Sequence, residues 1–221
     1  HYDKIRDFNT EKPLWVFVGN TVAGENSDIL EVIKFLAWFL NHPNEAATWI
    51  ADLVADKARL LDPNGNDIFL NHFTPLLKSN AKTIYNDILR RLFNASERQR
   101  LKLVNLRNSK GELALRVGSF APFALINIGD DSGFFKIAEH SHDFDTEIDD
   151  FGTGLFSTIN RKDSSLNVLI GSRKFTEGWS SWRVSTMGLL NMGKGEGSQI
   201  IQLFGRGVRL KGRRMSLKRS L

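Results

Sequence analysis

The amino-acid sequence predicts an α/β protein, with a parallel sheet flanked by helices, from the order of its apolar strands and helical stretches. The run LWVFV at residues 14–18 is apolar throughout and rich in β-branched and aromatic side chains, as in strands buried on both faces. Residues 28–40 then have the composition of a mostly buried helix, with Ser27 or Asn26 as its N-cap. Strand, tight loop and helix in this order form half of a βαβ unit.

The same order returns late in the chain. Residues 166–171 (LNVLIG) and 184–190 (VSTMGLL) have the composition of two more buried strands, and a further helix is expected from about residue 198. Strands that alternate with helices are characteristic of a parallel sheet. Both ends of the chain are therefore expected to contribute to one α/β core.

The middle of the chain predicts an α+β elaboration of this core. Helices are expected at residues 46–61 and 81–93, and residues 123–128 (FALINI) are expected to form another core strand. The runs LKLVNL and ELALRV on either side of RNSKG predict a β-hairpin. We therefore divide the chain into a first part of the core at residues 1–41, an elaboration at residues 42–160, and a second part of the core with a basic tail at residues 161–221.

Composition limits the classes of protein to which the chain can belong. With 221 residues, of which 41% are hydrophobic and 10% aromatic, it is long enough for a sizeable core. It has no cysteine, which excludes disulfides, thiolate metal sites and a cysteine nucleophile. The longest apolar run, at residues 29–40, is interrupted by Glu31 and Lys34 and is too short to span a bilayer. Because there is also no signal-peptide pattern, we expect a cytoplasmic protein without a membrane partner.

The positive charge of the chain is concentrated at its carboxyl end. The formal net charge is +5, and seven of the 30 Lys and Arg residues lie at residues 206–221, which contain no Asp or Glu. The most acidic stretch is EHSHDFDTEIDD at residues 139–150, which has six carboxylates and no Lys or Arg. A polyanion is therefore expected to meet the carboxyl end first. The chain also opens without an initiator Met and stops within the basic run, so we expect it to be part of a longer polypeptide.

The glycine-containing stretch GNTVAGENS at residues 19–27 has the G-x-x-x-x-G spacing of a loop that cradles phosphates. It lacks the Lys and the Ser or Thr that should follow, and it has Glu25 and Asn26 instead. A carboxylate at that place would repel a phosphate. The stretch therefore predicts a turn between strand and helix and not an independent triphosphate site.

A helix near the carboxyl end is expected to present polar and basic side chains on one face. At about 100° per residue, Arg206 and Arg209 fall with Gln202 within an arc of roughly 60°, and the apolar side chains lie on the far side. Gly205 and Gly207 weaken a helix and let another group approach closely. A solvated helix face would explain the arginines but not the glycines.

Three stretches, in order, carry a resemblance to a known family. QLFGRGVR at residues 202–209 matches the Q-x-x-G-R-x-x-R pattern of motif VI in superfamily 2 helicases. VLIGSRKFTEGWSSWRVS at residues 168–185 is similar to motif V, and PLWVFVGN at residues 13–20 is similar to the motif IV strand. The chain thus resembles the second RecA-like lobe of these helicases, whose fold is of the P-loop NTPase type. Within the superfamily, FTEGW at residues 175–179 together with GSQIIQLFGRGVRLKG at residues 197–212 resembles the helicase subunit of type III restriction enzymes and related DEAD/DEAH-box proteins.

The resemblance implies a part in ATP hydrolysis, with ATP and Mg²⁺ held mainly by the first RecA-like lobe of the same polypeptide. Arg206 and Arg209 would be arginine fingers, and Gln202 would assist them at the interface between the lobes. Four further residues would lie at the nucleotide: Glu177, Gly178, Ser180 and Gly205. Ser180 stands where the family often has an Asp that contacts the ribose, which leaves sugar recognition open. The phosphate-binding loop and acidic motif of a first lobe are absent, so this chain alone is not expected to hydrolyse ATP.

The resemblance also implies contacts with nucleic acid, expected to be double-stranded DNA. The residues that would make them are Gly19, Asn20, Ser172, Arg173, Lys211 and Arg213. A methyltransferase or specificity subunit, as in type III restriction systems, is a further expected partner. For Ser172 and Arg173 an ordinary pair of polar loop residues remains an alternative.

Two other functions remain open at this point. His140, His142, Asp143 and Asp145 combine ligand types suited to a divalent metal, which would fit a metal-dependent nuclease, although such a polar stretch is more often a solvated loop. The basic residues from Lys211 onward would fit a non-catalytic module that binds nucleic acid through phosphates.

Overall fold

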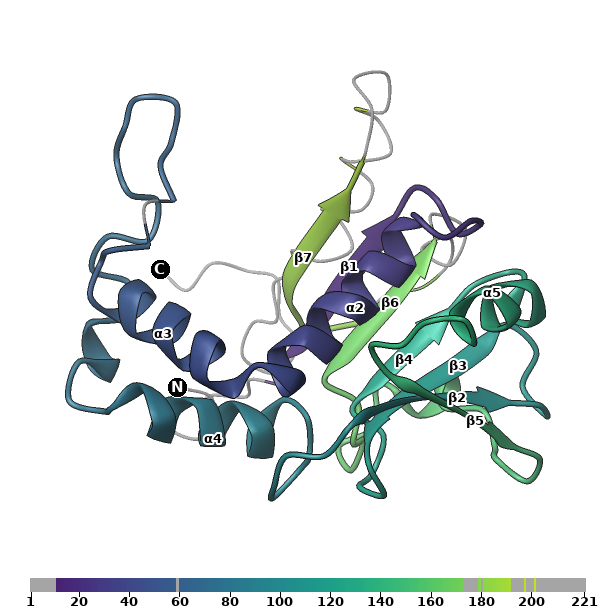
Figure 1. Ribbon diagram of the computed structural model, residues 1–221. Helices are drawn as coiled ribbons and strands as arrows, with labels where there is room; N and C mark the ends of the chain where they lie inside the picture. Colours follow the sequence, from purple (N-terminus) through teal and green to yellow (C-terminus); the bar gives the residue numbers. More distant parts are fainter. Residues whose placement is uncertain are drawn as a thin grey trace, which may run out of the picture.

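The computed structural model describes residues 11–58, 60–172, 179, 181–191, 197 and 201, and Figure 1 shows how their elements are arranged. Seven strands form one sheet in the order β5-β2-β3-β4-β6-β1-β7. The strands are β1 (Leu14–Gly19), β2 (Leu101–Leu106), β3 (Glu112–Val117), β4 (Ala124–Asn127), β5 (Asp145–Asp149), β6 (Val168–Ser172) and β7 (Val184–Leu190). The helices are α2 (Asp28–Asn41), α3 (Pro43–Val54), α4 (Ala81–Arg91) and α5 (Asp131–Ala138), with short 3-10 turns η2 (Thr74–Leu76) and η3 (Phe156–Thr158).

The sheet is mixed, with a predominantly parallel order. Strands β4, β6, β1 and β7 run parallel to one another, and β5 is parallel to β2. Strand β3 is antiparallel to both β2 and β4, so it alone opposes the other six strands of the described part of the chain. The predicted α/β class is therefore confirmed, and the expectation of a parallel sheet is corrected. The physical reason is the predicted hairpin, because a short turn after β2 forces β3 to return beside it.

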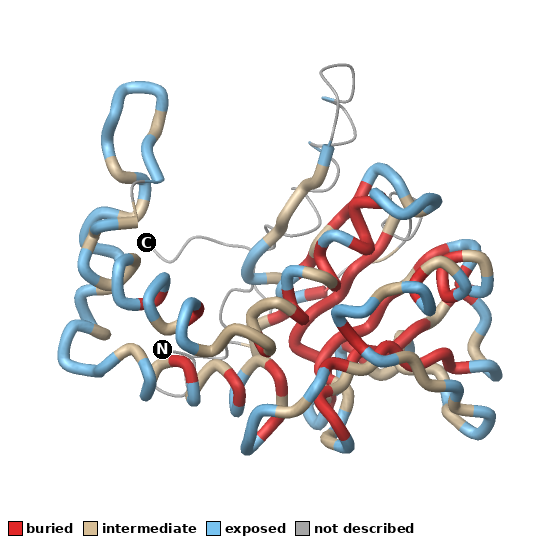
Figure 2. The backbone as a smooth tube through the Cα atoms, in the orientation of Figure 1, coloured by how far each residue is buried: buried red, intermediate tan, exposed pale blue. Residues whose placement is uncertain are grey.

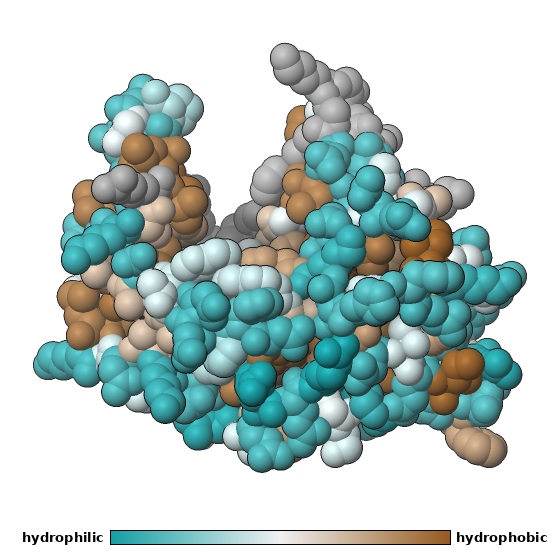
Figure 3. Space-filling view, viewed as in Figure 1, coloured by the Kyte–Doolittle hydropathy of each residue, from teal (hydrophilic) through white to brown (hydrophobic). Residues whose placement is uncertain are grey.

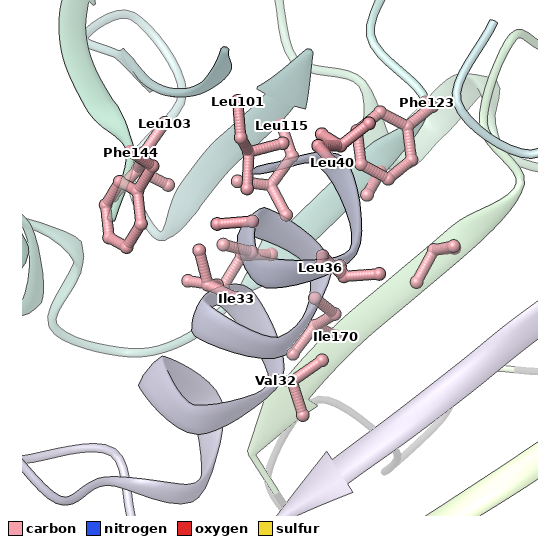
Figure 4. Close-up of a cluster of buried hydrophobic side chains, with 14 of the residues drawn as sticks. Val32, Ile33, Leu36, Leu40, Leu101, Leu103, Leu115, Phe123, Phe144 and Ile170 are labelled. Carbon is pink, nitrogen blue, oxygen red and sulfur yellow. The ribbon is translucent and has the colours of Figure 1, made fainter. Parts of the chain in front are cut away.

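Helix α2 and the strands beneath it make the main core. The Ser27 hydroxyl accepts a hydrogen bond from the Leu30 amide at 3.3 Å, as predicted for an N-cap. Ile33, Leu36 and Leu40 then point from the helix toward the sheet, where they meet side chains such as Leu103 (Figure 4). Figure 2 shows the buried backbone, in red, running through α2 and the central strands.

Helices α3 and α4 lie beside each other, away from the centre of the sheet (Figure 1). The predicted helix at residues 46–61 is shifted, since α3 begins at Pro43 and ends at Val54. Proline is favoured in the first turn of a helix, where its missing amide hydrogen is not needed. The end follows from the backbone of Asp56, whose φ of 56° lies in the left-handed region.

The part of the chain around α3 buries little of its apolar surface. Brown side chains gather over α3 and the loop after it in the space-filling view (Figure 3). Among the exposed hydrophobic side chains of α3 and of the segment up to α4 are Trp49, Leu60, Leu61, Ile68, Leu70 and Leu77. Within α3 only Ala46 and Ile50 are buried.

Helix α5 and strand β5 were not predicted. The acidic stretch that contains β5 was expected to be a solvated loop, but it forms an edge strand parallel to β2. Basic side chains of neighbouring strands make this possible. Glu147 is paired with Lys102 at 3.1 Å and with Arg116, and hydrogen bonds from these two side chains, outweighing its partial burial, lower the pKa of the Glu147 carboxyl.

No helix in the described ranges has both the length and the apolar character needed to cross a membrane.

Candidate functional site

A cleft opens at the carboxyl edge of the parallel strands. It lies among the ends of β1, β4 and β6 and one face of α5, and its volume is about 570 Å³. Its lining consists of Asn20, Val22, Ala23, Gly129, Asp130, Gly133, Phe134, Ile137 and Ser172. In open α/β sheets, ligands bind in crevices outside the carboxyl ends of the strands. This cleft is therefore the candidate functional site.

Three residues that the sequence predicted for a site meet at this edge. Gly19 is paired with Ser172 in the register of β1 and β6, and Asn20 follows directly after β1. Asn20 and Ser172 both line the cleft. The resemblance to motifs IV and V pointed to these residues. Each stands at the end of an apolar run, and adjacent parallel strands bring such ends to one edge of the sheet.

The other predicted site residues lie outside the described residues, and so does most of the helix expected from residue 198. They are Arg173, Glu177, Gly178, Ser180, Gln202, Gly205, Arg206, Arg209, Lys211 and Arg213.

The carboxylate of Asp28 organises the loop beside the cleft, and the sequence analysis missed it. Its Oδ2 accepts hydrogen bonds from the backbone amides of Asn20 and Thr21, both at 2.8 Å. Its Oδ1 accepts a hydrogen bond from the side-chain amide of Asn191, just beyond β7. The Asp28 amide in turn donates to the Thr21 hydroxyl at 3.0 Å. One side chain thus joins the start of α2 to the ends of β1 and β7. The available signal was an Asp in the first turn of a helix that directly follows a strand.

Hydrogen bonding decides the ionisation of Asp28. Burial, the largest single influence, raises the pKa of this carboxyl, but the hydrogen bonds from Thr21, Asn191 and Asn20 together lower it more, so the net shift is downward. The carboxyl is therefore ionised at neutral pH and acts only as an acceptor.

Asn20 is held by the same network. Its side-chain amide donates to the backbone oxygen of Asn191 at 3.1 Å, across the carboxyl edge. Asn191 itself has a φ of 48°, a left-handed conformation that asparagine tolerates better than most residues. The amide oxygen of Asn20 has no such bond in the described structure and is available to a ligand donor.

Gly19 is required by packing. A Cβ placed there would lie 2.9 Å from the Asp28 Cβ and 2.9 Å from the Ile29 Cδ1, closer than such contacts allow. The absence of a side chain lets β1 pass close to the first turn of α2. This role accounts for the glycine without any ligand.

The opposite edge of the sheet contains a buried arginine, Arg183, and a half-buried lysine, Lys12. Arg183 is 4% exposed and donates to the backbone oxygens of Lys12, Ile159 and Leu166. Lys12 donates to the Ser164 oxygen at 3.0 Å, and burial together with the charge of Arg183 lowers the pKa of its ammonium. Both residues lie just before the amino ends of strands, Lys12 before β1 and Arg183 before β7. They are therefore at the end of the sheet opposite the cleft.

The side chains suggested for a metal site make other contacts. Asp145 is paired with Arg100 at 2.8 Å, and Asp143 accepts from the Ser141 hydroxyl at 3.3 Å. The Nδ1 of His140 lies 2.8 Å from the Lys136 oxygen, to which it must donate. Within the part of the chain that the structure describes, no three or more His, Cys, Asp and Glu side chains are grouped to hold a metal ion.

Comparisons of the chain with protein-family models, with curated proteins and with solved structures found no significant match. A function must accordingly be inferred from the motifs of the chain and the geometry of its carboxyl edge.

The substitution Asp28→Asn tests the carboxylate network. In this variant an NH2 group replaces one carboxylate oxygen. It faces the N–H donors of Asn20 and Thr21 or that of Asn191, so at least one of these hydrogen bonds is lost. We expect the free energy of unfolding at pH 7, measured with urea, to fall by about 1.5 to 3 kcal/mol. Because the pKa is lower in the folded chain, the carboxylate stabilises the fold above its unfolded pKa of about 3.9 and loses this effect as the pH falls further. The difference from the unaltered chain should therefore shrink below about pH 4.

The matched control is Glu31→Gln, one turn further along α2. Glu31 is 59% exposed and makes only a surface pair with Lys34. Its replacement should cost less than about 1 kcal/mol. Equal stability of the two variants at pH 7 would contradict the role given to Asp28.

The substitution Gly19→Ala tests the close approach of β1 to α2. The added methyl group must displace the first turn of the helix, so we expect a loss of about 1 to 3 kcal/mol in the free energy of unfolding. Gly129→Ala is the control, because a Cβ there has no heavy atom within 4 Å. If neither Gly19→Ala nor Gly129→Ala changes the urea midpoint of unfolding, the close packing at Gly19 does not constrain the fold.

Proposed function

We propose that the chain is the second RecA-like lobe of a superfamily 2 ATP-dependent DNA translocase or helicase, in a system of the type III restriction class. The observation that carries the proposal is the meeting of two motifs at one cleft. Strand β1, which resembles motif IV, lies parallel and adjacent to β6, which resembles motif V. As a result Asn20 and Ser172 line the same cleft.

Two side chains of the cleft support a contact with a nucleic-acid backbone. Asn20 offers an amide and Ser172 a hydroxyl, which are among the neutral groups that proteins place against phosphate and sugar oxygens. The one carboxylate in the lining, on Asp130, accepts from the Gly133 amide at 2.9 Å and so caps α5. Arg173 follows Ser172 in the sequence and would supply the positive charge that phosphates require.

Arg206, Arg209 and Gln202 form the catalytic part of the proposal. They would reach an ATP molecule whose phosphates and Mg²⁺ are held mainly by the first lobe, with Glu177, Gly178, Ser180 and Gly205 nearby. Arginine fingers stabilise the charge that develops on the transferred phosphoryl group and raise turnover by about 10³ to 10⁵. This corresponds to roughly 4 to 7 kcal/mol of barrier.

A non-catalytic DNA-binding module is the second candidate, and the concentration of charge at residues 206–221 favours it. In that case Lys211, Arg213 and their neighbours would bind phosphates without regard to ATP. Affinity would fall steeply with salt, and ATP turnover would be unaffected.

Ser172→Glu tests the cleft as a phosphate-binding site. In the polypeptide that contains both lobes, a carboxylate in the cleft should weaken binding of a fluorescent DNA duplex by about tenfold or more, because it repels the backbone. Ser157→Glu makes the same change of charge at an exposed position of η3 and should leave affinity nearly unchanged. Equal DNA affinities of the two variants would show that the cleft does not contact DNA.

Arg209→Ala separates the two candidate functions. With both lobes present, we expect DNA-stimulated ATP turnover to fall by about 10³ or more while DNA affinity stays close to its original value. Lys211→Ala combined with Arg213→Ala should do the opposite, weakening DNA binding and reducing its dependence on salt. Normal turnover by Arg209→Ala would overturn the assignment of the arginine finger and leave the binding module.

A further inference from the structure

A second cleft lies on the other side of α5, between that helix and strands β2 and β5. Its volume is about 400 Å³. Positions 130, 133, 134 and 137 line the candidate site, whereas positions 131, 132, 135, 136 and 139 line the second cleft. Opposite faces of one helix therefore border two separate clefts at the same edge of the sheet.

Two acceptors in the second cleft, one of them a buried atom, have no donor within the described residues. Asn105, near the end of β2, is 9% exposed, and its Oδ1 is buried without a hydrogen-bond partner. Asp131, at the first position of α5, is 8% exposed, and its carboxylate makes no hydrogen bond or ion pair with the described part of the chain. Both residues line the cleft. Burying the Asn105 oxygen without a donor is unfavourable, and the accessible Asp131 carboxylate lines the same cleft, which together point to a ligand that supplies donors.

The two acceptors specify the kind of group that binds between them. A carboxylate and an amide oxygen accept hydrogen bonds and donate none. A phosphate or carboxylate would be repelled at this place, whereas a primary ammonium offers three donors and the opposite charge.

Two basic side chains in the cleft balance the charge of its acidic residues. Lys136 is exposed and has no ion-pair partner among the described residues, and Arg107 reaches Asp150 at 3.3 Å on the exposed side. With Asp131 and Glu139, the lining therefore contains two acids and two bases. Ile148, opposite Asn105 in the sheet register, is 44% exposed and offers an apolar contact.

We propose that this cleft binds a small zwitterion of the amino-acid class. The ammonium would lie between Asn105 and Asp131, the carboxylate at Lys136, and an apolar side chain against Ile148. The balance of acids and bases disfavours a polyamine or a polyphosphate. A cleft of about 400 Å³ lies within the range of small-molecule sites. The inference uses none of the residues assigned to DNA or ATP.

L-leucine is a suitable probe, and two relatives of it separate the contributions of its charges. N-acetyl-L-leucine lacks the ammonium, and isoamylamine lacks the carboxylate. Titration of the 221-residue chain by calorimetry should show binding of leucine, weaker binding of isoamylamine and no binding of N-acetyl-leucine. No binding of leucine at concentrations up to about 10 mM, or equal binding of leucine and N-acetyl-leucine, would overturn the proposal.

Variants assign the binding to this cleft. Asp131→Asn keeps the shape of the side chain and should weaken both leucine and isoamylamine by about tenfold or more. Lys136→Ala, at an exposed position that folding does not require, should weaken leucine but not isoamylamine. Glu31→Gln, on α2, should change neither. Unchanged leucine affinity in Asp131→Asn and Lys136→Ala, with folding verified by circular dichroism, would place any binding elsewhere.

Discussion

The carboxylate of Asp28 is the interaction on which the carboxyl edge depends. It accepts from the loop after β1 with one oxygen and from Asn191 after β7 with the other. Asp28 also belongs to the first turn of α2, whose apolar face rests on the sheet. This one carboxylate therefore fixes the position of the first turn of α2 relative to the carboxyl ends of the parallel strands β1 and β7. Gly19 makes this possible because it leaves room for the helix beside β1.

Helix α5 sets the geometry of the rest of that edge. It follows β4 and has one buried side that packs on the sheet through Phe134 and Phe135. Its two flanks border separate clefts, one lined mainly by apolar and neutral polar side chains together with the Asp130 carboxylate, the other by two acids and two bases among other residues. If α5 were displaced, both clefts would change together. The two proposed ligands, a DNA backbone and a small zwitterion, would thus bind to sites that share a wall.

The balance of charge across the sheet explains why an acidic stretch can form an edge strand. Glu147 would repel its neighbours in an unpaired strand, but Lys102 and Arg116 lie on the adjacent strands β2 and β3. Arg100 pairs with Asp145 in the same way. Side chains 45 residues apart in the sequence neutralise one another only after β5 has joined β2. The strand β5 could therefore not be predicted from the acidic composition of residues 139–150.

Local sequence determined the elements whose stability depends on their own residues. The apolar runs of β1, β4 and β6, the hairpin of β2 and β3, and the serine cap of α2 were all predictable, because burial and turn chemistry act over a few residues. Strand β7 was also predicted, but as a buried strand, whereas it lies at the end of the sheet and none of its residues is buried. Gly19, Asn20 and Ser172 were selected because their stretches resemble motifs IV and V, and they also stand where apolar runs end. Tertiary structure alone decided the order of the strands, including the pairing of β3 with β4 and of β5 with β2. It also decided that Asp28 joins three elements and that Asn105 and Asp131 share a cleft, since these contacts join residues distant in the sequence whose partners exist only in the folded chain.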